Sequence, residues 1–387
     1  MISFLALSGG VSVATASGGW DFDFEPSADD AGGLYDDLFD ALDELTTAVA
    51  APPSRKSMKP LVRGARNAPR GIIHRGSAVG EVPQLIAAGA SIAGVPIMDM
   101  RTGRVIEVPT IGNLSLKSTI YDEAEDSRIL LGEAVDGSRA GTRFAIKVVF
   151  PQSDEDLVEL DREIQALTDL REVDSVMRLV YAPEGMAKTP RGKELKYCVL
   201  ELLGESLQDL LADEFERGNM PMPMIESVAV QGLRTLQAVH ALGYVHGDVG
   251  MGNLMFTDAS RTMLKLIDFG YAKKFRNSDG SHVVPGVNPL PAKARSVLSV
   301  SELDGHFPAR KDDLHRFGEV LLKLLNTDYT WLFRGATGAA IRKIKMETVP
   351  SACCSRADRR FDKYFELVRG LGYDQEPDYA ALIDIFA

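Results

Sequence analysis

Two short motifs near the middle of the chain constrain its fold and its chemistry more than any other feature. Residues 245–253 read VHGDVGMGN, and residues 268–270 read DFG. They supply a carboxylate at Asp248, an amide at Asn253 and a second carboxylate at Asp268. In phosphoryl transfer, one Asp orients the acceptor hydroxyl and accepts its proton, while an Asn and a second Asp hold Mg²⁺ against the nucleotide phosphates. The order and spacing therefore predict a phosphoryl-transfer site that uses ATP and Mg²⁺.

The cation that such a site needs lies upstream. The apolar, strand-like run FAIK ends in Lys147, which lies 101 residues before Asp248, and Glu163 follows Lys147 by 16 residues. A Lys on a strand that faces a Glu on the next helix forms an ion pair, which aims the ammonium at the α- and β-phosphates. Two apolar residues, Ala145 and Met255, flank this Lys and the Asn of the loop. We expect them to close above and below an adenine ring.

The composition limits the class of protein. With 387 residues, the chain is long enough for a two-lobed core and an additional tail. Its net charge of −12 argues against nucleic acid as a partner, because phosphate binding usually requires a basic surface. It contains no run of 18 apolar residues that would predict a transmembrane helix. The three cysteines show no metal-binding spacing and are expected to be free or buried thiols: Cys198, Cys353 and Cys354.

The first 79 residues differ in composition from the rest. Residues 1–16 contain an apolar stretch and end in ATA, a small-x-small cleavage site, so they form a candidate signal peptide. With such a leader the protein would be secreted or enter a vacuole or organelle lumen, and without it we expect a cytoplasmic location. The alternative for this segment is a Ser/Gly-rich terminus without fixed structure. Residues 17–79 are acidic and then basic, which is typical of a disordered extension. Their basic part, residues 55–75, could make weak contact with an anionic membrane surface.

Beyond this extension, the pattern of apolar residues predicts an α+β fold with two lobes. Residues 80–112 are expected to pack on the first lobe. This lobe covers residues 113–203 and is rich in strands, while the second lobe, residues 204–387, is mostly helical. A cleft between the lobes would hold the site. The expected strands are 114–120, 128–134, 142–150 and 197–202, and the expected helices are 154–170, 207–218, 225–242, 314–325 and 361–371.

Three further stretches read VLELLGESL (199–207), RKDDLHRFG (310–318) and YDQEPDY (373–379). With the motifs above, they make the chain from about residue 114 onward resemble the eukaryotic protein kinase superfamily, and within it the casein kinase I and vaccinia-related kinase branch. The first stretch resembles the hinge of that branch, the second replaces the usual tryptophan-containing helix, and the third is typical of the branch. The resemblance implies the bilobal protein kinase fold. It also places Glu201 and Leu203 beside the nucleotide, and makes Asp313 the buried carboxylate that braces the catalytic loop.

Several residues depart from the pattern of this family. The segment that should be a glycine-rich phosphate cover reads IYDEAEDSR at residues 120–128, and its four acidic side chains should repel ATP unless the segment turns away. The usual Arg and Lys of the catalytic loop are replaced by Gly247 and Gly250. The loop thus lacks one cation for a phosphorylated activation segment and another for the transferred phosphoryl group. These departures, together with the candidate leader and the charged extension, make the chain similar to the secreted with-no-Gly-loop, rhoptry-type kinases of apicomplexan parasites.

The expected function is that of a monomeric protein kinase that transfers the γ-phosphoryl group of ATP to Ser or Thr hydroxyls of a protein substrate. The alternative is a pseudokinase, which uses the same fold as a scaffold or an allosteric binding module. The glycine-free segment, Gly247 and Gly250 favour this alternative. A small-molecule phosphotransferase would fit the Asp-Asn-Asp core but not the EPDY sequence at residues 376–379. His246 is expected to be a structural residue of the loop rather than a base or a metal ligand.

Overall fold

A computed structural model describes residues 103–123, 127–217, 220–277, 279–283, 286, 298–325 and 336–387, together with four short strands nearer the N-terminus. These strands form two antiparallel pairs: β1 (Leu5–Leu7) with β2 (Gly10–Ser12), and β3 (Ser91–Ile92) with β4 (Val95–Pro96). The candidate leader falls largely outside the described residues, and the extension over residues 17–79 lies entirely outside them. The chain divides into one unit of residues 77–332 and 344–387 and another of residues 1–76 and 333–343. The first unit contains all the residues of the site.

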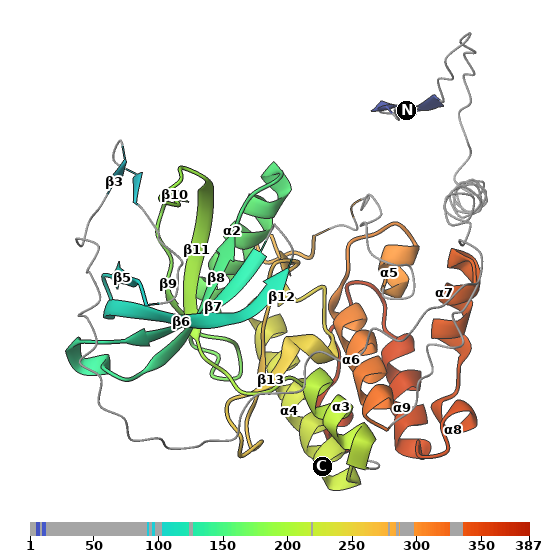
Figure 1. Ribbon diagram of the computed structural model, residues 1–387. Helices are drawn as coiled ribbons and strands as arrows, with labels where there is room; N and C mark the ends of the chain where they lie inside the picture. The colour runs from blue at the N-terminus through green and yellow to red at the C-terminus, as the bar shows by residue number, and fades with distance from the viewer. Residues whose placement is uncertain are drawn as a thin grey trace, which may run out of the picture. The chain divides into compact units, whose positions relative to one another are not determined.

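An antiparallel sheet of seven strands forms the first lobe (Figure 1). Six strands follow the order β10-β11-β8-β7-β6-β5, and β9 pairs with β11. Their bounds are β5 (Val105–Val108), β6 (Gly112–Glu123), β7 (Ser127–Ala134), β8 (Arg143–Val149), β9 (Leu179–Tyr181), β10 (Ala187–Lys188) and β11 (Glu194–Glu201), with the 3₁₀ turn η1 (Gly137–Arg139) between β7 and β8. The strands at 114–120, 128–134, 142–150 and 197–202 were all expected, whereas β5 lies in the segment that was expected to pack on this lobe.

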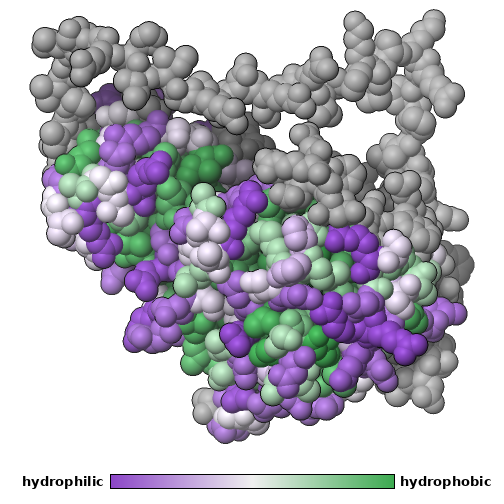
Figure 2. Space-filling view, turned by 90° about the horizontal axis from the view of Figure 1, so that it is seen from below, coloured by the Kyte–Doolittle hydropathy of each residue, from purple (hydrophilic) through white to green (hydrophobic). Residues whose placement is uncertain are grey.

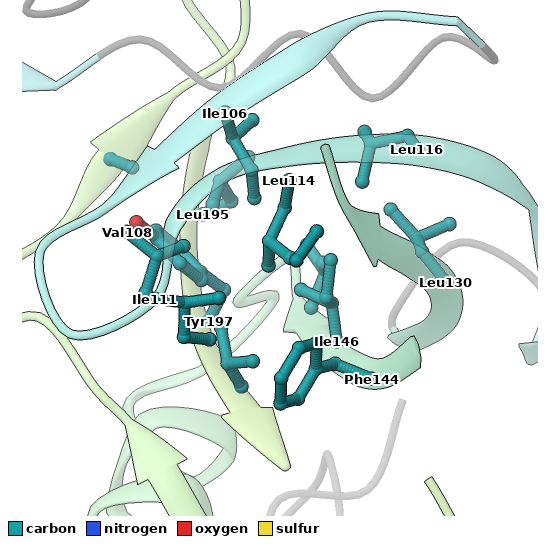
Figure 3. Packing of buried hydrophobic residues seen from close by; sticks show 14 of the residues in the cluster. Ile106, Val108, Ile111, Leu114, Leu116, Leu130, Phe144, Ile146, Leu195 and Tyr197 are labelled. Atoms are coloured by element: carbon teal, nitrogen blue, oxygen red, sulfur yellow. The ribbon is translucent and has the colours of Figure 1, made fainter. Parts of the chain in front are cut away.

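The side chains of β8 point alternately into the core of this lobe and toward the site. Phe144 and Ile146 are buried in a hydrophobic cluster with residues of β5, β6 and β11, as Figure 3 shows. Val148 belongs to the same cluster. Because successive side chains of a strand point to opposite faces, Ala145 and Lys147 lie on the other face of the sheet. The FAIK run therefore builds the core with one set of side chains and presents a cation with the other.

The segment expected to cover the phosphates is a β-hairpin. Strands β6 and β7 stay paired up to Glu123 opposite Ser127, so that only residues 124–126 connect them. Register shifts interrupt the ladder between Leu116 and Ser118 and between Thr119 and Tyr121. Such irregularities bend a strand and increase its local twist. Apart from these irregularities, the two strands are paired from Leu114 to Glu123, so the expected phosphate cover is part of the sheet as far as Glu123.

Helix α2 (Asp154–Asp169) follows β8 and lies beside the sheet (Figure 1). It begins after Ser153 because the carboxylate of Asp156 accepts hydrogen bonds from the backbone amides of Ser153 (2.8 Å) and Gln152 (2.7 Å). Capping of this kind satisfies amides that have no partner within the helix. The cap fixes where the helix starts, and so which residues face the sheet: Leu160, Glu163, Ala166 and Leu167 are buried.

The second lobe is mainly helical, as expected, so the α+β, bilobal fold is confirmed. Its helices are α3 (Leu207–Arg217), α4 (Met222–Ala241), α5 (Val300–Leu303), α6 (Arg310–Leu324), α8 (Pro350–Cys353), α9 (Arg359–Arg369) and α10 (Tyr379–Asp384), while α7 (Gly338–Glu347) runs from one unit into the other. Short strands form two antiparallel pairs: β12 (Tyr244–Val245) with β15 (Lys273–Lys274), and β13 (Leu254–Phe256) with β14 (Leu264–Leu266).

Helix α6 is the buried centre of this lobe, packed against α4 and α9 (Figure 1). The ring of Phe317 lies so close to α4 that a Cβ added at Gly232 would be 2.2 Å from its Cζ atom, so a glycine is required there. The sequence predicted that this helix begins at Leu314, but it begins at Arg310. Three charged residues of its first turn are buried: Arg310, Asp312 and Asp313. Asp312 caps the helix by accepting a 2.7 Å hydrogen bond from the amide of Ala309.

The described surface is mixed in character. Figure 2 shows one face on which purple hydrophilic residues surround small green hydrophobic areas. The exposed large apolar side chains include Leu242, Met263 and Val349. Within the described ranges, no helix is sufficiently long and apolar to cross a membrane. All three cysteines are free, and Cys198 and Cys354 are buried, as expected.

Candidate active site

Lys147 lies between two carboxylates. Its Nζ atom is 2.6 Å from Oε2 of Glu163 on α2 and 3.4 Å from Oδ1 of Asp268. The ion pair with Glu163 was expected, and the Glu163 side chain is only 3% exposed. Burial alone would lower the pKa of Lys147, but the charges of Glu163 and Asp268 outweigh burial and hold the pKa above its ordinary value. The ammonium therefore stays charged and ties the strand-rich lobe to the DFG motif.

The DFG motif is held from two sides. Asp268 has a φ of 60°, in the left-handed region that non-glycine residues rarely adopt, and Phe269 beside it is fully buried. The guanidinium of Arg162, on α2, donates a 2.6 Å hydrogen bond to the carbonyl oxygen of Gly270. Burial would raise the pKa of Asp268, but the charge and hydrogen bond of Lys147, together with His246 and the amide of Gly270, outweigh burial and lower the pKa. Helix α2 thus positions both the cation and the backbone that follows Asp268.

The catalytic loop, residues 246–253, brings Asp248 and Asn253 together. The Nδ2 atom of Asn253 donates to the carbonyl oxygen of Asp248 at 2.9 Å and to its Oδ2 at 3.3 Å. The other carboxylate oxygen of Asp248, Oδ1, lies 3.1 Å from Nη1 of Arg316 on α6. The Asp248 side chain remains 29% exposed. It is therefore fixed at both oxygens and still accessible.

His246 is a structural residue, as expected. It is fully buried, its Nε2 atom lies 2.9 Å from the carbonyl oxygen of Ile267, and its Nδ1 atom accepts a 3.2 Å hydrogen bond from the amide of Asp248. These partners assign the proton to Nε2. The imidazole therefore joins the catalytic loop to the segment that precedes the DFG motif.

Asp313 braces the loop from α6. It is fully buried and accepts hydrogen bonds from the amides of His246 (2.7 Å) and Gly247 (2.9 Å). Its Oδ2 atom also lies 2.9 Å from Nε2 of His240, whose Nδ1 atom lies 2.5 Å from the hydroxyl of Tyr379. The EPDY sequence near the end of the chain is thereby connected to the catalytic loop through α4 and α6.

The replacement of the usual Arg by Gly247 has a structural reason. Gly247 has a φ of 75°, and a Cβ added there would lie 2.9 Å from the carbonyl oxygen of Tyr271. Any side chain would meet strain and a close contact at this position. Gly250 is different, because its φ is −153° and the nearest heavy atom to an added Cβ is 3.9 Å away.

The residues expected around adenine come from both lobes. Ala145 shares a sheet face with Lys147, while Met255 on β13 forms an isolated bridge with Ser206, within the hinge-like stretch 199–207. The carboxylate of Glu201 is already bound by Nζ of Lys265 (2.5 Å) and the amide of Arg178 (2.7 Å). Both contacts use Oε1 of Glu201, and the same lobe junction contains the half-buried Leu203.

The donor set suits Mg²⁺. Asn253 and Asp268 lie on paired segments, because the amide of Ile267 donates a 2.9 Å hydrogen bond to the carbonyl oxygen of Asn253. Both side-chain hydrogen bonds of Asn253 use its nitrogen, so that its amide oxygen is the atom left for a cation. Within the described ranges, no three His, Cys, Asp or Glu side chains form a metal cage. Mg²⁺ commonly takes only one or two protein ligands together with phosphates and water, so the two residues fit it.

Sequence reasoning missed several residues of this site. Ile129 lies directly opposite Lys147 on β7, on the same face of the sheet, and the alternation of β7 could have identified it. Arg162 lies on α2 one position before Glu163, and it resembles an ordinary surface residue in the sequence. Lys265 and Arg316 are far from their partners in the sequence, and only the fold brings them into contact.

Comparisons with known proteins agree with this geometry. A sequence model of the protein kinase domain matches residues 132–288, starting after the β6–β7 turn. The chain contains a protein kinase domain. The match includes Lys147, Glu163, Asp248, Asn253 and Asp268.

Relatives of the kinase domain include casein kinase I-like proteins. Casein kinase I homolog 2 of Schizosaccharomyces pombe is 30% identical over 200 residues, which cover 49% of this chain and 45% of that protein. Casein kinase 1-like protein HD16 of Oryza sativa subsp. japonica is 28% identical over 197 residues, which cover 49% of this chain and 27% of that protein. The chain thus spans less than half the length of these relatives. The expected likeness to casein kinase I-like proteins is confirmed for the kinase domain.

Proposed function

We propose that this chain is a protein kinase that uses ATP and Mg²⁺ to phosphorylate Ser or Thr hydroxyls of a protein substrate. The observation that carries the proposal is the Lys147 ammonium, 2.6 Å from Glu163 and 3.4 Å from Asp268. Paired titratable groups with shifted pKa values at a junction of two lobes are typical of functional sites. The pair that would bind phosphate is thus assembled beside the carboxylate that would bind metal.

The proposed reaction gives each residue one task. The substrate hydroxyl oxygen forms a bond to the γ-phosphorus of ATP, its proton passes to Asp248, and the bond from the γ-phosphorus to the bridging oxygen breaks to release ADP. Lys147, held by Glu163, would contact the α- and β-phosphates. Ala145 and Met255 would enclose the adenine, and the main chain of Glu201 and Leu203 would border it.

Asn253 and Asp268 would hold Mg²⁺. Bound there, the ion would neutralise phosphate charge as the leaving group departs. The 3.3 Å contact between Asn253 Nδ2 and Asp248 Oδ2 connects the proposed metal ligand to the proposed base. Replacement of Asn253 should therefore affect metal binding and the orientation of Asp248 together.

The alternative is a pseudokinase that acts as a scaffold or allosteric binding module. The glycine-free hairpin between β6 and β7 favours it, because close approach of backbone amides to phosphates normally uses glycines. Gly247 and Gly250 also remove two cations from the loop. We favour the enzyme because all five residues that the chemistry requires are present.

Nucleotide binding separates the two proposals at the first stage. We propose a melting-temperature titration of the full chain with millimolar ATP, with and without Mg²⁺, alongside Asp268→Ala. A ligand that binds only the folded state stabilises it by about 2.7 kcal/mol at 100 times its Kd. The kinase proposal predicts a Mg²⁺-dependent rise that Asp268→Ala abolishes. No shift in the wild type would favour the pseudokinase, and phosphate transfer to dephosphorylated casein is then measured on any chain that does bind.

A further inference from the structure

The guanidinium of Arg316 is buried behind the catalytic loop and contacts two carboxylates. Its Nη1 atom lies 3.1 Å from Oδ1 of Asp248, and its Nη2 atom lies 2.6 Å from Oε2 of Glu302. The side chains of Arg316 and Glu302 are each 5% exposed. A buried charge persists only when it is paired, and Arg316 is paired on both sides.

The contact supplies a charge that the loop lacks. Residues 246–253 read HGDVGMGN and contain neither Lys nor Arg. Phosphoryl transfer concentrates negative charge beside the base, and enzymes normally place fixed cations there. In this chain the cation beside Asp248 is Arg316 on α6, which lies 68 residues further along the sequence.

The fold holds this cation in a defined place. Arg316 is three residues after Asp313, so both side chains lie on the same face of α6. Asp313 binds the amides of His246 and Gly247, and Arg316 binds the carboxylate of the next residue, Asp248. One helix face therefore fixes three consecutive residues of the catalytic loop.

Glu302 anchors the other end of the guanidinium. Its Oε2 atom accepts a 2.8 Å hydrogen bond from the amide of Ser299, and its own amide donates a 3.2 Å hydrogen bond to Oγ of Ser299. This reciprocal cap fixes Glu302 at the start of α5. The Arg316 guanidinium thus bridges the fixed carboxylate of Glu302 and the carboxylate of Asp248, the proposed base.

We propose that Arg316 is a positioning residue, which holds the Asp248 carboxylate in the orientation that accepts the substrate proton and supplies the positive charge that the loop lacks. This inference rests on the proposed kinase function. Asn253 contacts Oδ2 of Asp248 and Arg316 contacts Oδ1, so removal of Arg316 takes away the cation at Oδ1 and leaves the contact of Asn253 in place. The expected defect is in turnover rather than in nucleotide binding.

The test measures kcat and KM for ATP in the full chain, with dephosphorylated casein as the acceptor. Arg316→Met should lower kcat by about 10- to 100-fold, the scale of a mispositioned catalytic group, with KM for ATP changed by less than about threefold. Arg310→Met is the matched control. Arg310 is equally buried on α6, but its Nη2 atom donates to the carbonyl oxygen of Asp374 and its guanidinium lies over Phe275. This variant should lose stability and keep kcat per folded molecule.

Rescue distinguishes positioning from packing. Gly250 has space for a side chain, so Gly250→Lys in the Arg316→Met background can return a cation to the loop and should recover at least about tenfold in kcat. Glu302→Gln leaves Arg316 in place but weakens the contact that holds its guanidinium, so it should lower kcat by a smaller factor. It is the substitute test if Arg316→Met does not fold.

Each outcome decides one proposal. Wild-type kcat in folded Arg316→Met, an equal loss in Arg310→Met, or no recovery with Gly250→Lys overturns the role of Arg316 and leaves the kinase proposal standing. Absence of transfer by the wild type overturns the kinase proposal, and the role of Arg316 in catalysis with it.

Discussion

The backbone amide of Gly247 donates a 2.9 Å hydrogen bond to Oδ1 of Asp313, so a buried carboxylate of α6 determines where the catalytic loop lies. The same carboxylate accepts from the amide of His246 and contacts His240. Burial would raise the pKa of Asp313, but the hydrogen bond and charge of His240, with the amide of His246, hold it below its ordinary value of 3.8. This group couples the stability of the domain to the geometry of the loop.

Replacement of Asp313 by Asn should destabilise the chain and change its response to acid. The Asn amide nitrogen would face backbone amides, and an unsatisfied buried donor costs about 1–3 kcal/mol. A carboxylate with a lowered pKa stabilises the fold above its unfolded pKa of 3.8, and this contribution disappears as the pH falls through the folded value. In urea denaturation, the difference in free energy of unfolding between wild type and variant should therefore be large at pH 7 and decrease below pH 3.8. A difference that is constant with pH would contradict the account.

Glu163→Gln should weaken the site without unfolding the lobe. The ammonium of Lys147 would retain Asp268 but lose its 2.6 Å partner, so its position toward phosphate would be less defined. We expect kcat/KM for ATP to fall by about 10- to 100-fold. Asp161→Asn is the control, because Asp161 lies on the same helix with its side chain 56% exposed and pairs with Lys196. Equal activity losses in the two variants would mean that α2 acts only through its fold.

The two glycines of the catalytic loop should respond differently to substitution. Gly247→Ala forces an L residue to a φ of 75° with its Cβ 2.9 Å from the Tyr271 carbonyl oxygen, and strain of this kind costs about 1–3 kcal/mol. Gly250→Ala has an extended backbone and no atom closer than 3.9 Å, so its free energy of unfolding should change by less than about 0.5 kcal/mol. Thermal or urea unfolding measures both, and similar losses would exclude this explanation of Gly247.

His315 should make the protein sensitive to mild acid. Burial lowers the pKa of His315 to about 4, while its Nε2 atom lies 3.0 Å from the carbonyl oxygen of Lys345. Since the unfolded chain takes up this proton near pH 6.5, stability should fall as the pH drops from 6.5 toward 4, by about 1.4 kcal/mol per pH unit. His315→Gln should lose this slope. An unchanged slope in His315→Gln would show that another group titrates.

The sequence predicted the residues whose identity and order carry the chemistry. Lys147 and Glu163 could be paired in advance because a strand and the next helix bring them together, and their ion pair is present. Arg316 could not be predicted, because it contacts Asp248 only through the packing of α6 behind the loop. The start of α6 was missed for a related reason: Arg310 and Asp312 look like surface residues in the sequence, although both are buried and hydrogen-bonded. The burial of Asp313 was expected, but only from the resemblance to the kinase family.

Strand β5 shows a second limit of the sequence. Its four residues, VIEV, are too few to establish a period, yet Ile106 and Val108 lie in the core of the first lobe. The acidic segment at residues 120–128 shows a third limit. Its composition predicted repulsion of ATP, and the backbone pairing of β6 with β7 up to Glu123 and Ser127 could not be read from it. The predictions for residues 17–79, the leader and the location of the protein remain predictions.

The most direct test of the kinase proposal is transfer of the γ-phosphoryl group of ATP to dephosphorylated casein by the full chain, by Asp248→Asn and by Asp174→Asn. Asp174 has a side chain that is 90% exposed and is the control for loss of one carboxylate. The account predicts transfer by the wild type and by Asp174→Asn, and a loss of at least about 100-fold in Asp248→Asn with stabilisation by Mg²⁺ and ATP retained. Equal transfer by Asp248→Asn, or none by a wild type that binds Mg²⁺ and ATP, would contradict it.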